Sequence, residues 1–294
     1  MSRQEHSAPA PRSSQHLRTA PSHGDTTVFD ASHQTFYEGK WIEPDYSDGS
    51  LRNWLVRKQR FFLSHLPRSS TARVLDLGCG AGWKLFTRAG NVVGIDLSRQ
   101  SLATAKTLYH DVASGYLSHL PFRDGSFDTV VSCDVLGHIP PEFKQQVLNE
   151  IYRVLKPGGR TLHYIETEGD DPLTNYAKQD VELYRRHIIG PEGHEGLESP
   201  AENFQRFRDA GFRPSHEQAA YRMLMYVGRI RQLYDNEYAR RSKPVAAIVG
   251  LSKLLTSVAP LEIASNLGMA AVLEVTDRVL PASWGNGAMV EYVK

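Results

Sequence analysis

The sequence has little of what marks secreted, membrane-spanning or nucleic-acid-binding proteins. Its 294 residues include two cysteines, Cys79 and Cys133, which form no CxxC pair and no disulfide framework. The 34 basic and 33 acidic residues leave a net charge of +1, so no overall field attracts nucleic acid or an acidic membrane. The longest apolar stretch, residues 244–273, is interrupted by charged residues and a proline, short of the roughly 20 apolar residues of a membrane span. We therefore expect a cytoplasmic protein without a transmembrane segment.

Composition also divides the chain. The first 26 residues are rich in Ser, Pro and His and hold no apolar segment, which predicts a disordered tail rather than a signal peptide. Residues 27–294 are long enough to bury one core, so we predict one domain. Within it, the polar, glycine-containing residues 167–200 are predicted to be a lid insertion, and residues 221–281 a helical insertion.

Helices and strands are predicted to alternate along the first half of this domain. Apolar residues at helical spacing predict a helix over 51–66, with Arg57 and Arg60 on a solvated face. Short β-rich runs predict strands, at residues 73–78, 91–96, 126–134, 160–166, 212–220 and 288–293. The alternation predicts an α/β fold with a parallel sheet covered on both faces. In the last run, the exposed-looking Glu291 fits an antiparallel strand near a sheet edge.

A glycine-rich turn follows the first of these strands. Gly78, Gly80 and Gly82 lie directly behind the apolar run, where missing side chains admit a ligand and a helix N-terminus offers free N–H groups. The dinucleotide pattern G-x-G-x-x-G would need a third glycine at position 83, and Trp83 is there, which weakens an NAD site. Asp96 ends the next predicted strand, where a carboxylate accepts hydrogen bonds from ribose hydroxyls. A nucleoside ligand is therefore indicated.

Four motifs in order then carry a family resemblance. They are VLDLGCGAG (74–82), GIDLS (94–98), LPFRDGSFDTVVSCDVLGHI (120–139) and EIYRVLKPGGRTLHYIE (150–166). Together they resemble class I S-adenosylmethionine (SAM)-dependent methyltransferases, specifically the small-molecule, methyltransferase type 11-like group. The resemblance implies a doubly wound, mostly parallel seven-stranded Rossmann-like sheet with its last strand antiparallel, carrying helical additions. It also implies SAM as cofactor and S-adenosylhomocysteine as product.

The resemblance further implies which residues hold the cofactor. Asp76, Gly78 and Gly80 would surround its methionine end. Asp96 would hold the ribose hydroxyls, and Leu97 would pack on adenine. A structural interpretation stands beside this one, in which the glycines form turns and Asp96 caps a helix.

The adenine contact departs from the family pattern. An aspartate shortly before the LPF motif usually contacts the adenine amino group, but Tyr116 occupies that position. Either Asp111 or the backbone at Leu117 is left for this role. Cys133, at the end of the fourth strand, resembles the position whose backbone faces the amino group of the cofactor, and simple packing is the alternative.

Methyl transfer from a sulfonium needs alignment of the attacking atom, and an alcohol or phenol also benefits from a base. His138, after the fourth strand, is our first candidate for that base, with support of a loop as its alternative role. His194, in the lid insertion, is the second candidate. His163 lies inside a predicted strand and is expected to be a hydrogen-bonded core residue, whereas Glu166, at the end of that strand, either orients an acceptor hydroxyl or caps a loop.

Other residues near the expected site have weaker signals. His187 and His194 suggest a metal, but their spacing offers no second tight pair, so we expect none. Tyr37 and Trp41 precede the first helix, where they either close the pocket over the cofactor or anchor the segment. Arg57 and Arg60 either meet an anionic group or, as the default, stay solvated.

The helical insertion offers two further surfaces. One is an adaptable apolar wall over an acceptor, made of Met223, Met225, Tyr226, Leu233 and Tyr234. The other is a lipid-facing patch formed where basic residues adjoin an apolar stretch, namely Arg240, Arg241 and Lys243. Packing on the sheet or a dimer contact is the alternative to both.

The sequence thus predicts SAM-dependent methylation of a small-molecule acceptor, at an oxygen of an apolar or aromatic metabolite. N- or C-methylation of a lipid or quinone-like acceptor is the alternative, as is a non-catalytic SAM-binding sensor. Nucleic acid is not an expected partner, because the chain lacks [DN]PP[YF] after the fourth strand and a basic stripe with interleaved aromatics. We expect a monomer or homodimer, with weak membrane-surface contact left open.

Overall fold

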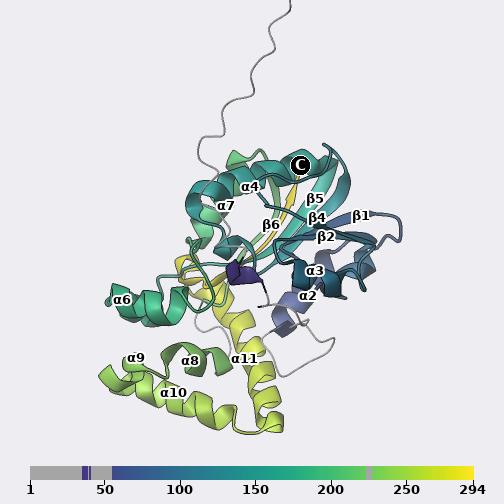
Figure 1. The fold of residues 1–294 in the computed structure, drawn as a ribbon. Coiled ribbons are helices and arrows are strands. Elements are labelled where there is room, and N and C mark those ends of the chain that lie inside the picture. Colours follow the sequence, from purple (N-terminus) through teal and green to yellow (C-terminus); the bar gives the residue numbers. More distant parts are fainter. Residues whose placement is uncertain (1–34, 39, 41–54, 223–226) are drawn as a thin grey trace, which may run out of the picture.

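The computed structural model describes residues 35–38, 40, 55–222 and 227–294. The predicted tail, Trp41 and three members of the predicted apolar wall (Met223, Met225 and Tyr226) lie outside these residues. At the centre is a seven-stranded sheet in the order β3-β2-β1-β4-β5-β7-β6 (Figure 1). Its strands are β1 (Arg73–Leu77), β2 (Asn91–Asp96), β3 (Asp111–Ser114), β4 (Phe127–Cys133), β5 (Leu155–Glu166), β6 (Arg213–Ala220) and β7 (Gly287–Val293).

The first five strands are parallel, and β7 runs antiparallel to both of its neighbours. The fold expected from the motifs is therefore confirmed: a doubly wound, mostly parallel seven-stranded sheet whose last strand is antiparallel. β7 lies one strand in from the edge, since β6 pairs along its outer side, which agrees with the antiparallel position near a sheet edge that was expected. Glu291 of β7 is accordingly buried and receives hydrogen bonds from Arg160 and Ser215, which corrects the expectation that it is exposed.

Helices cover both faces of the sheet and continue beyond it (Figure 1). The regular helices are α2 (Leu55–His65), α3 (Arg99–Ala105), α4 (Pro141–Val154), α5 (Pro172–Lys178), α6 (Val181–Tyr184), α7 (Pro200–Asp209), α8 (Val227–Tyr234), α9 (Glu237–Arg241), α10 (Lys243–Leu255) and α11 (Ala259–Val279). Short 3-10 or π turns are η1 (Phe86–Ala89), η2 (Leu136–His138), η3 (Arg185–Ile189) and η4 (Ala282–Trp284).

Alternation along the strands supplies a core on each face. Leu75 packs in the cluster that includes α4 and α7, whereas its neighbour Val74 packs in the cluster that includes α2 and α11. Successive strand residues point to opposite faces, so a strand buried on both sides needs apolar residues at every position. This is why β1 consists almost wholly of buried residues.

Helix α2 lies between the sheet and α11, and its basic residues are not all solvated as expected. Arg57 is buried and donates to Asp277 of α11 at 2.7 Å. Lys58 is fully buried, and its Nζ lies 2.5 Å from Oδ1 of Asp134, directly after β4. Arg60 alone of these three is exposed, with its NH1 2.9 Å from Glu274. The helix is thus held to the body of the protein by ion pairs that bury two cations.

Removing the buried cation should destabilise the protein more than removing the exposed one. Lys58→Met leaves Asp134 with little access to water and without its ammonium partner, which costs about 3 kcal/mol. Arg60→Met removes a solvated pair and should cost less than about 1 kcal/mol. Urea unfolding of both variants measures the difference, and equal losses would contradict the role given to Lys58.

The two predicted insertions form one helical unit. Buried residues of the lid, among them Ala177, Leu183 and Ile188, pack in a third cluster with Ile230 and Val249 of the helical insertion. Figure 1 shows α6 and α8–α10 grouped away from the sheet. Within the described residues, no helix combines the length and apolar content that crossing a membrane requires.

Candidate functional site

The glycine-rich turn after β1 needs its glycines for its own shape. Gly78, Gly80 and Gly82 have φ values of 58°, 49° and 85°, in the left-handed region that side chains disfavour. A Cβ on Gly78 would also lie 2.8 Å from the side chain of Val135. Backbone conformation and packing therefore account for part of this motif, in addition to the room for a ligand expected from the sequence.

Asp96 lies at the carboxyl end of β2, beside this turn. Its Oδ2 accepts a hydrogen bond from the backbone N–H of Gly80, and its Oδ1 one from that of Ser98, both at 2.8 Å. A carboxylate has about four acceptor sites, and the backbone N–H of Leu97 also acts on Asp96, so part of its acceptor capacity remains for a ribose hydroxyl. Burial raises the pKa of Asp96 despite these hydrogen bonds. Asp96 thus lies beside the glycine turn, and its contact with the ribose hydroxyls stays a prediction.

Asp76 occupies a more enclosed position than its predicted role implies. It is buried, and the hydroxyl of Tyr109 donates to its Oδ2 at 2.7 Å. Burial raises the pKa of Asp76 to about 8, although the Tyr109 hydrogen bond works in the other direction. The same tyrosine oxygen accepts from the backbone N–H of Trp83 at 2.6 Å. Tyr109, which the sequence analysis missed, therefore ties the glycine turn to β1.

The structure argues against one of the two residues left for the adenine contact, Asp111. Asp111 begins β3 and pairs with Val93, so it lies three residues before the carboxyl end of the sheet that Asp96 marks. A parallel strand rises about 3.3 Å per residue, which puts Asp111 too far down the strand for an adenine contact. Ser114 is the β3 residue beside Asp96. Three other predicted contacts, Leu97, Leu117 and Cys133, are each partly buried. Their contacts with the cofactor stay predictions.

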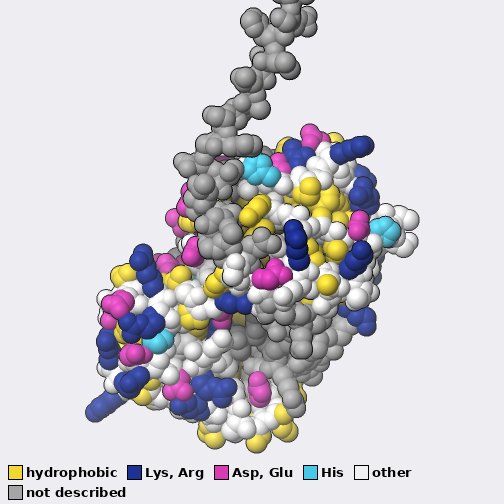
Figure 2. Space-filling model, in the orientation of Figure 1, with side chains coloured by type: hydrophobic (Ala, Val, Ile, Leu, Met, Phe, Trp, Pro, Cys, Tyr) yellow, Lys and Arg dark blue, Asp and Glu magenta, His cyan; other side chains and the backbone are white. Residues whose placement is uncertain are grey.

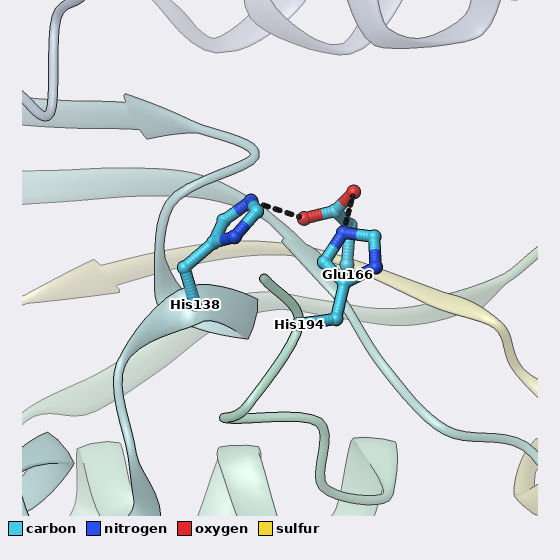
Figure 3. A group of neighbouring side chains, drawn as sticks. All are labelled: His138, Glu166 and His194. Carbon is cyan, nitrogen blue, oxygen red and sulfur yellow. Dashed lines mark hydrogen bonds and ion pairs between the residues drawn. The ribbon is translucent and has the colours of Figure 1, made fainter. Parts of the chain in front are cut away.

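Two histidines and one carboxylate meet at the carboxyl ends of β4 and β5. Glu166 ends β5, His138 lies in η2 after β4, and His194 comes from the lid (Figure 3). Nε2 of His194 lies 2.9 Å from Oε1 of Glu166, and Nε2 of His138 lies 3.4 Å from Oε2. The two imidazole rings are 4.7 Å apart, with the carboxylate reaching both. Both sequence candidates for a base are therefore brought together, with Glu166 between them.

The tautomer of His138 follows from its second contact. Nδ1 lies 3.1 Å from the carbonyl oxygen of Gly193. A carbonyl only accepts hydrogen bonds, so Nδ1 carries a proton and Nε2 is the basic nitrogen of the neutral ring. That nitrogen faces Glu166, whose negative charge stabilises a proton received there.

The electrostatics of the cluster agree with this arrangement. Burial lowers the pKa of His138, but hydrogen bonding and the charge of Glu166 outweigh it, so the pKa is raised. Burial raises the pKa of Glu166, but the charge of His194, the hydrogen bond from His194 and the charge that His138 carries when protonated hold it well below its usual value. The carboxylate is thus ionised at neutral pH, and His138 binds a proton more tightly than a free histidine.

The lid is fixed over the end of the sheet. The backbone N–H of Gly196 donates to the carbonyl of Gly137 at 2.9 Å, and Lys144 of α4 donates to the carbonyl of Gly196 at 2.6 Å. Glu192 of the lid forms a two-pronged ion pair with Arg229 of α8. These contacts determine the position of His194.

The described residues before α2 lie over the same edge. The carboxylate of Glu38 accepts hydrogen bonds from the backbone N–H groups of Arg99 and Gln100 at the start of α3. The ring of Tyr37 lies 6.2 Å from that of His138, edge to face. Burial raises the pKa of Tyr37 to about 12, and the charges of nearby acids, including Asp96 and Glu166, add to the shift. Tyr37 therefore lies between the two halves of the site.

The remaining candidates lie elsewhere. His163 is fully buried in β5, where Ser132 and Thr161 contact its two nitrogens and burial lowers its pKa to about 3, as expected of a core histidine. His187 pairs with Glu237 at 2.6 Å rather than with His194.

A cavity opens beside the cluster. Glu166 and His194 form part of its wall, and α8 contributes Ile230, Leu233 and Tyr234. Two of the five residues expected to form an apolar wall are thus placed at a cavity. The ligand atoms of His138, Glu166 and His194 also lie within 4.8 Å of one another, a spacing that a metal ion can bridge.

Fold and site together define a Rossmann-like methyltransferase architecture. Residues 75–163 match the family model described as a methyltransferase domain. A demethylmenaquinone methyltransferase of Lactiplantibacillus plantarum is 40% identical over 153 residues, which is 45% of this chain and 62% of the relative. An arsenite methyltransferase of Aquipseudomonas alcaligenes is 36% identical over 138 residues, 40% of this chain and 39% of the relative. Residues 75–163 of this chain are thus similar to a methyltransferase domain.

Solved structures agree with the fold. Phosphoethanolamine N-methyltransferase 2 of Haemonchus contortus, in complex with SAM, has a TM-score of 0.51 at 20% identity, covering 81% of this chain and 52% of that one. The [4+2]-cyclase SpnF has a TM-score of 0.50 at 20% identity, covering 81% and 80%. The matches to the curated relatives above span less than two thirds of their lengths.

Proposed function

We propose that this protein transfers the methyl group of SAM to an oxygen of a small apolar or aromatic acceptor. The observation that carries the proposal is the meeting of His138, Glu166 and His194 at the carboxyl ends of β4 and β5. Ligands of open α/β sheets bind beyond these ends. An acceptor hydroxyl there finds a basic nitrogen backed by a carboxylate.

On the cofactor side, Asp96 holds the ribose hydroxyls with the lone pairs that Gly80 and Ser98 leave available. Gly78 and Gly80 let the methionine part approach the backbone, Asp76 supports the turn from beneath, and Leu97, Leu117 and Cys133 line the adenine and amino-group sides. Bound SAM supplies a methyl group that its sulfonium charge has already activated. The protein's part is to align the acceptor and exclude water.

On the acceptor side, the neutral imidazole of His138 takes the hydroxyl proton at Nε2. Glu166 stabilises the resulting imidazolium, and His194 holds the other carboxylate oxygen in place. Tyr37 covers this region from the N-terminal side. The body of the acceptor occupies the cavity walled by Glu166, His194 and α8, whose Ile230 and Leu233 suit an apolar group, and its hydroxyl extends past Glu166 to His138, which is not part of that wall.

Turnover provides the test. Purified protein is incubated with SAM and a mixture of phenols, alcohols and quinols. We expect one molecule of methyl ether to form for each molecule of S-adenosylhomocysteine released. Product without an ether, carrying the methyl group on carbon or nitrogen, would favour the second candidate, a lipid or quinone-like acceptor. That candidate is supported by the similarity to a demethylmenaquinone methyltransferase. Binding of SAM without any product would favour a sensor.

Chelation separates a base from a metal at the same residues. Each histidine already pairs with Glu166, so the cluster balances its own charge and we expect no metal. Dialysis against EDTA should therefore leave the methylation rate unchanged. Loss of activity that zinc or another divalent cation restores would show that the three side chains act as ligands instead.

A further inference from the structure

The hairpin of α10 and α11 concentrates the exposed aliphatic side chains of the protein. Among the described residues, ten large hydrophobic side chains are exposed, and eight of them lie between residues 248 and 279. They are Ile248, Leu251, Leu254, Val258, Leu267, Val272, Val275 and Val279. Single exposed aliphatics are ordinary on soluble proteins, but eight of them on two successive helices point to an interaction surface.

This surface faces away from the body of the protein. The inner side of α10 is buried through Val245, Val249 and Ser252, whose hydroxyl donates to the carbonyl of Val227 in α8. The outer side carries Ile248, Leu251 and further small apolar residues. Figure 1 shows α10 and the start of α11 at the end of the molecule remote from β1–β5, whereas the end of α11 reaches α2, where Asp277 pairs with Arg57; Figure 2 shows hydrophobic side chains along that lower edge.

Charge is distributed unevenly along the same segment. The 30 residues from 244 to 273 contain two charged residues, Lys253 and Glu262. Directly before them stand Arg240, Arg241 and Lys243, all exposed. Lys and Arg side chains gather beside the hydrophobic edge in Figure 2. An apolar helical face bordered by basic residues is the pattern of a helix that lies in a membrane interface.

We propose that the α10–α11 hairpin docks on the surface of a lipid bilayer that contains anionic headgroups. Leu251, Leu254 and Val258 enter the boundary between headgroups and acyl chains. Arg240 and Lys243 contact lipid phosphates. The protein lies on the bilayer without crossing it.

A bilayer fits the surface better than a second copy of the chain. In a twofold dimer the apolar patch meets only itself, and the basic residues beside it, Arg240 and Lys243, have no part in the contact. An anionic bilayer engages both the apolar face and these cations. Lys253 does not enter this contrast, because its Nζ lies 2.7 Å from Oδ2 of Asp235.

The location of the hairpin also defines a substrate class, and this step rests on the proposed function. Helix α8 packs on α10 on one side, and on the other it lines the cavity beside Glu166 and His194 with Ile230, Leu233 and Tyr234. A docked hairpin therefore brings the cavity wall near the membrane. The acceptor assigned by this arrangement is a lipid-soluble molecule that partitions into the bilayer.

Vesicle flotation tests the docking directly. The full chain should float with vesicles of phosphatidylcholine containing about 30% phosphatidylglycerol and bind pure phosphatidylcholine vesicles more weakly. Leu251→Glu/Leu254→Glu should lower the partition coefficient about tenfold or more, because two carboxylates replace the side chains that enter the interface. Val181→Glu is the matched control, since Val181 and Leu254 are 62% and 61% exposed but Val181 lies on α6. Arg240→Gln/Lys243→Gln should reduce binding to the anionic vesicles alone, by about fivefold per residue.

Two outcomes would overturn the proposal. The first is that the wild-type protein binds neither kind of vesicle, or that the double glutamate variant binds both kinds as strongly as the wild type does. The other is a wild-type dimer, seen by sedimentation, that the glutamate variant converts to a monomer while vesicle binding is absent; a second copy then covers the surface. Titration of SAM into the same samples reports on the cofactor site separately, so failure to dock and failure of the proposed function are distinguished.

Discussion

Asp96→Ala should weaken binding of SAM and S-adenosylhomocysteine by about a hundredfold or more. Two ribose hydroxyls donating to a charged, largely buried acceptor contribute about 1.5–3 kcal/mol each. The variant also frees the backbone N–H groups of Gly80 and Ser98, so the turn is less well ordered before the ligand arrives. Isothermal titration calorimetry measures the change in affinity.

Asp111→Ala is the matched control for Asp96→Ala. It removes an exposed aspartate at the other end of the neighbouring strand, and affinity should be unchanged. Thermal unfolding of both variants checks that the fold persists. Wild-type affinity in Asp96→Ala would remove this residue from the cofactor site, and a loss in Asp111→Ala would restore it as the adenine contact.

The second large effect is expected at His138. His138→Ala should lower the single-turnover rate at saturating acceptor by about 10²- to 10⁴-fold, the range for loss of a general base. His138→Gln preserves a donor toward Gly193 but takes up no proton, so it should be equally slow. His110→Ala, on the exposed surface, should be normal. Transfer at the wild-type rate in His138→Gln would show that the residue only anchors the lid.

The pH profile of the wild-type enzyme carries the same information. The base must be neutral, and the groups facing His138 are Glu166, Asp134, His194 and Tyr37, of which the two acids raise its pKa. The rate should therefore rise with pH through an apparent pKa above 6.5, the unperturbed value. Glu166→Gln removes the largest contribution that raises this pKa, so the limb should move to lower pH as the rate falls. If the rising part of the pH–rate profile stayed at the same pH in Glu166→Gln, the result would contradict the pairing of His138 with Glu166.

The sequence predicts the buried strands well because their signal is local. β1, β2 and β4 are covered on both faces, so each is mostly buried and carries apolar residues on both of its sides, which makes it stand out from its surroundings. β3 was not predicted from its residues, because it is a four-residue edge strand, DVAS, whose residues are exposed or half-buried. Its existence was implied by the family resemblance alone.

Long-range pairs explain the burial that the sequence analysis missed. Arg57 meets Asp277, 220 residues later, and Arg160 meets Glu291, 131 residues later. The sequence close to Arg57 or to Glu291 contains no sign of its distant partner, so each looks like an ordinary charged residue on the surface of a helix or strand. Only the packing of α11 on α2 buries Arg57, and only the pairing of β6 with β7 buries Glu291, whose partner Arg160 stays exposed.

The candidate site was predictable residue by residue but not as a cluster. His138 and Glu166 stand at strand ends, which predicts their place at the carboxyl edge. His194 joins them because the lid approaches η2 very closely. The signal for that approach is in the glycines beside it: Gly193 has a φ of 74°, and a Cβ on Gly196 would lie 2.0 Å from the carbonyl oxygen of Ile139.

A crystal structure with S-adenosylhomocysteine tests the central claim most directly. The account predicts that the ribose hydroxyls lie within hydrogen-bonding distance of the carboxylate of Asp96. It also predicts that the sulfur faces His138, Glu166 and His194, leaving room for an acceptor between them. A nucleoside bound elsewhere, or a sulfur turned away from the three side chains, would contradict it.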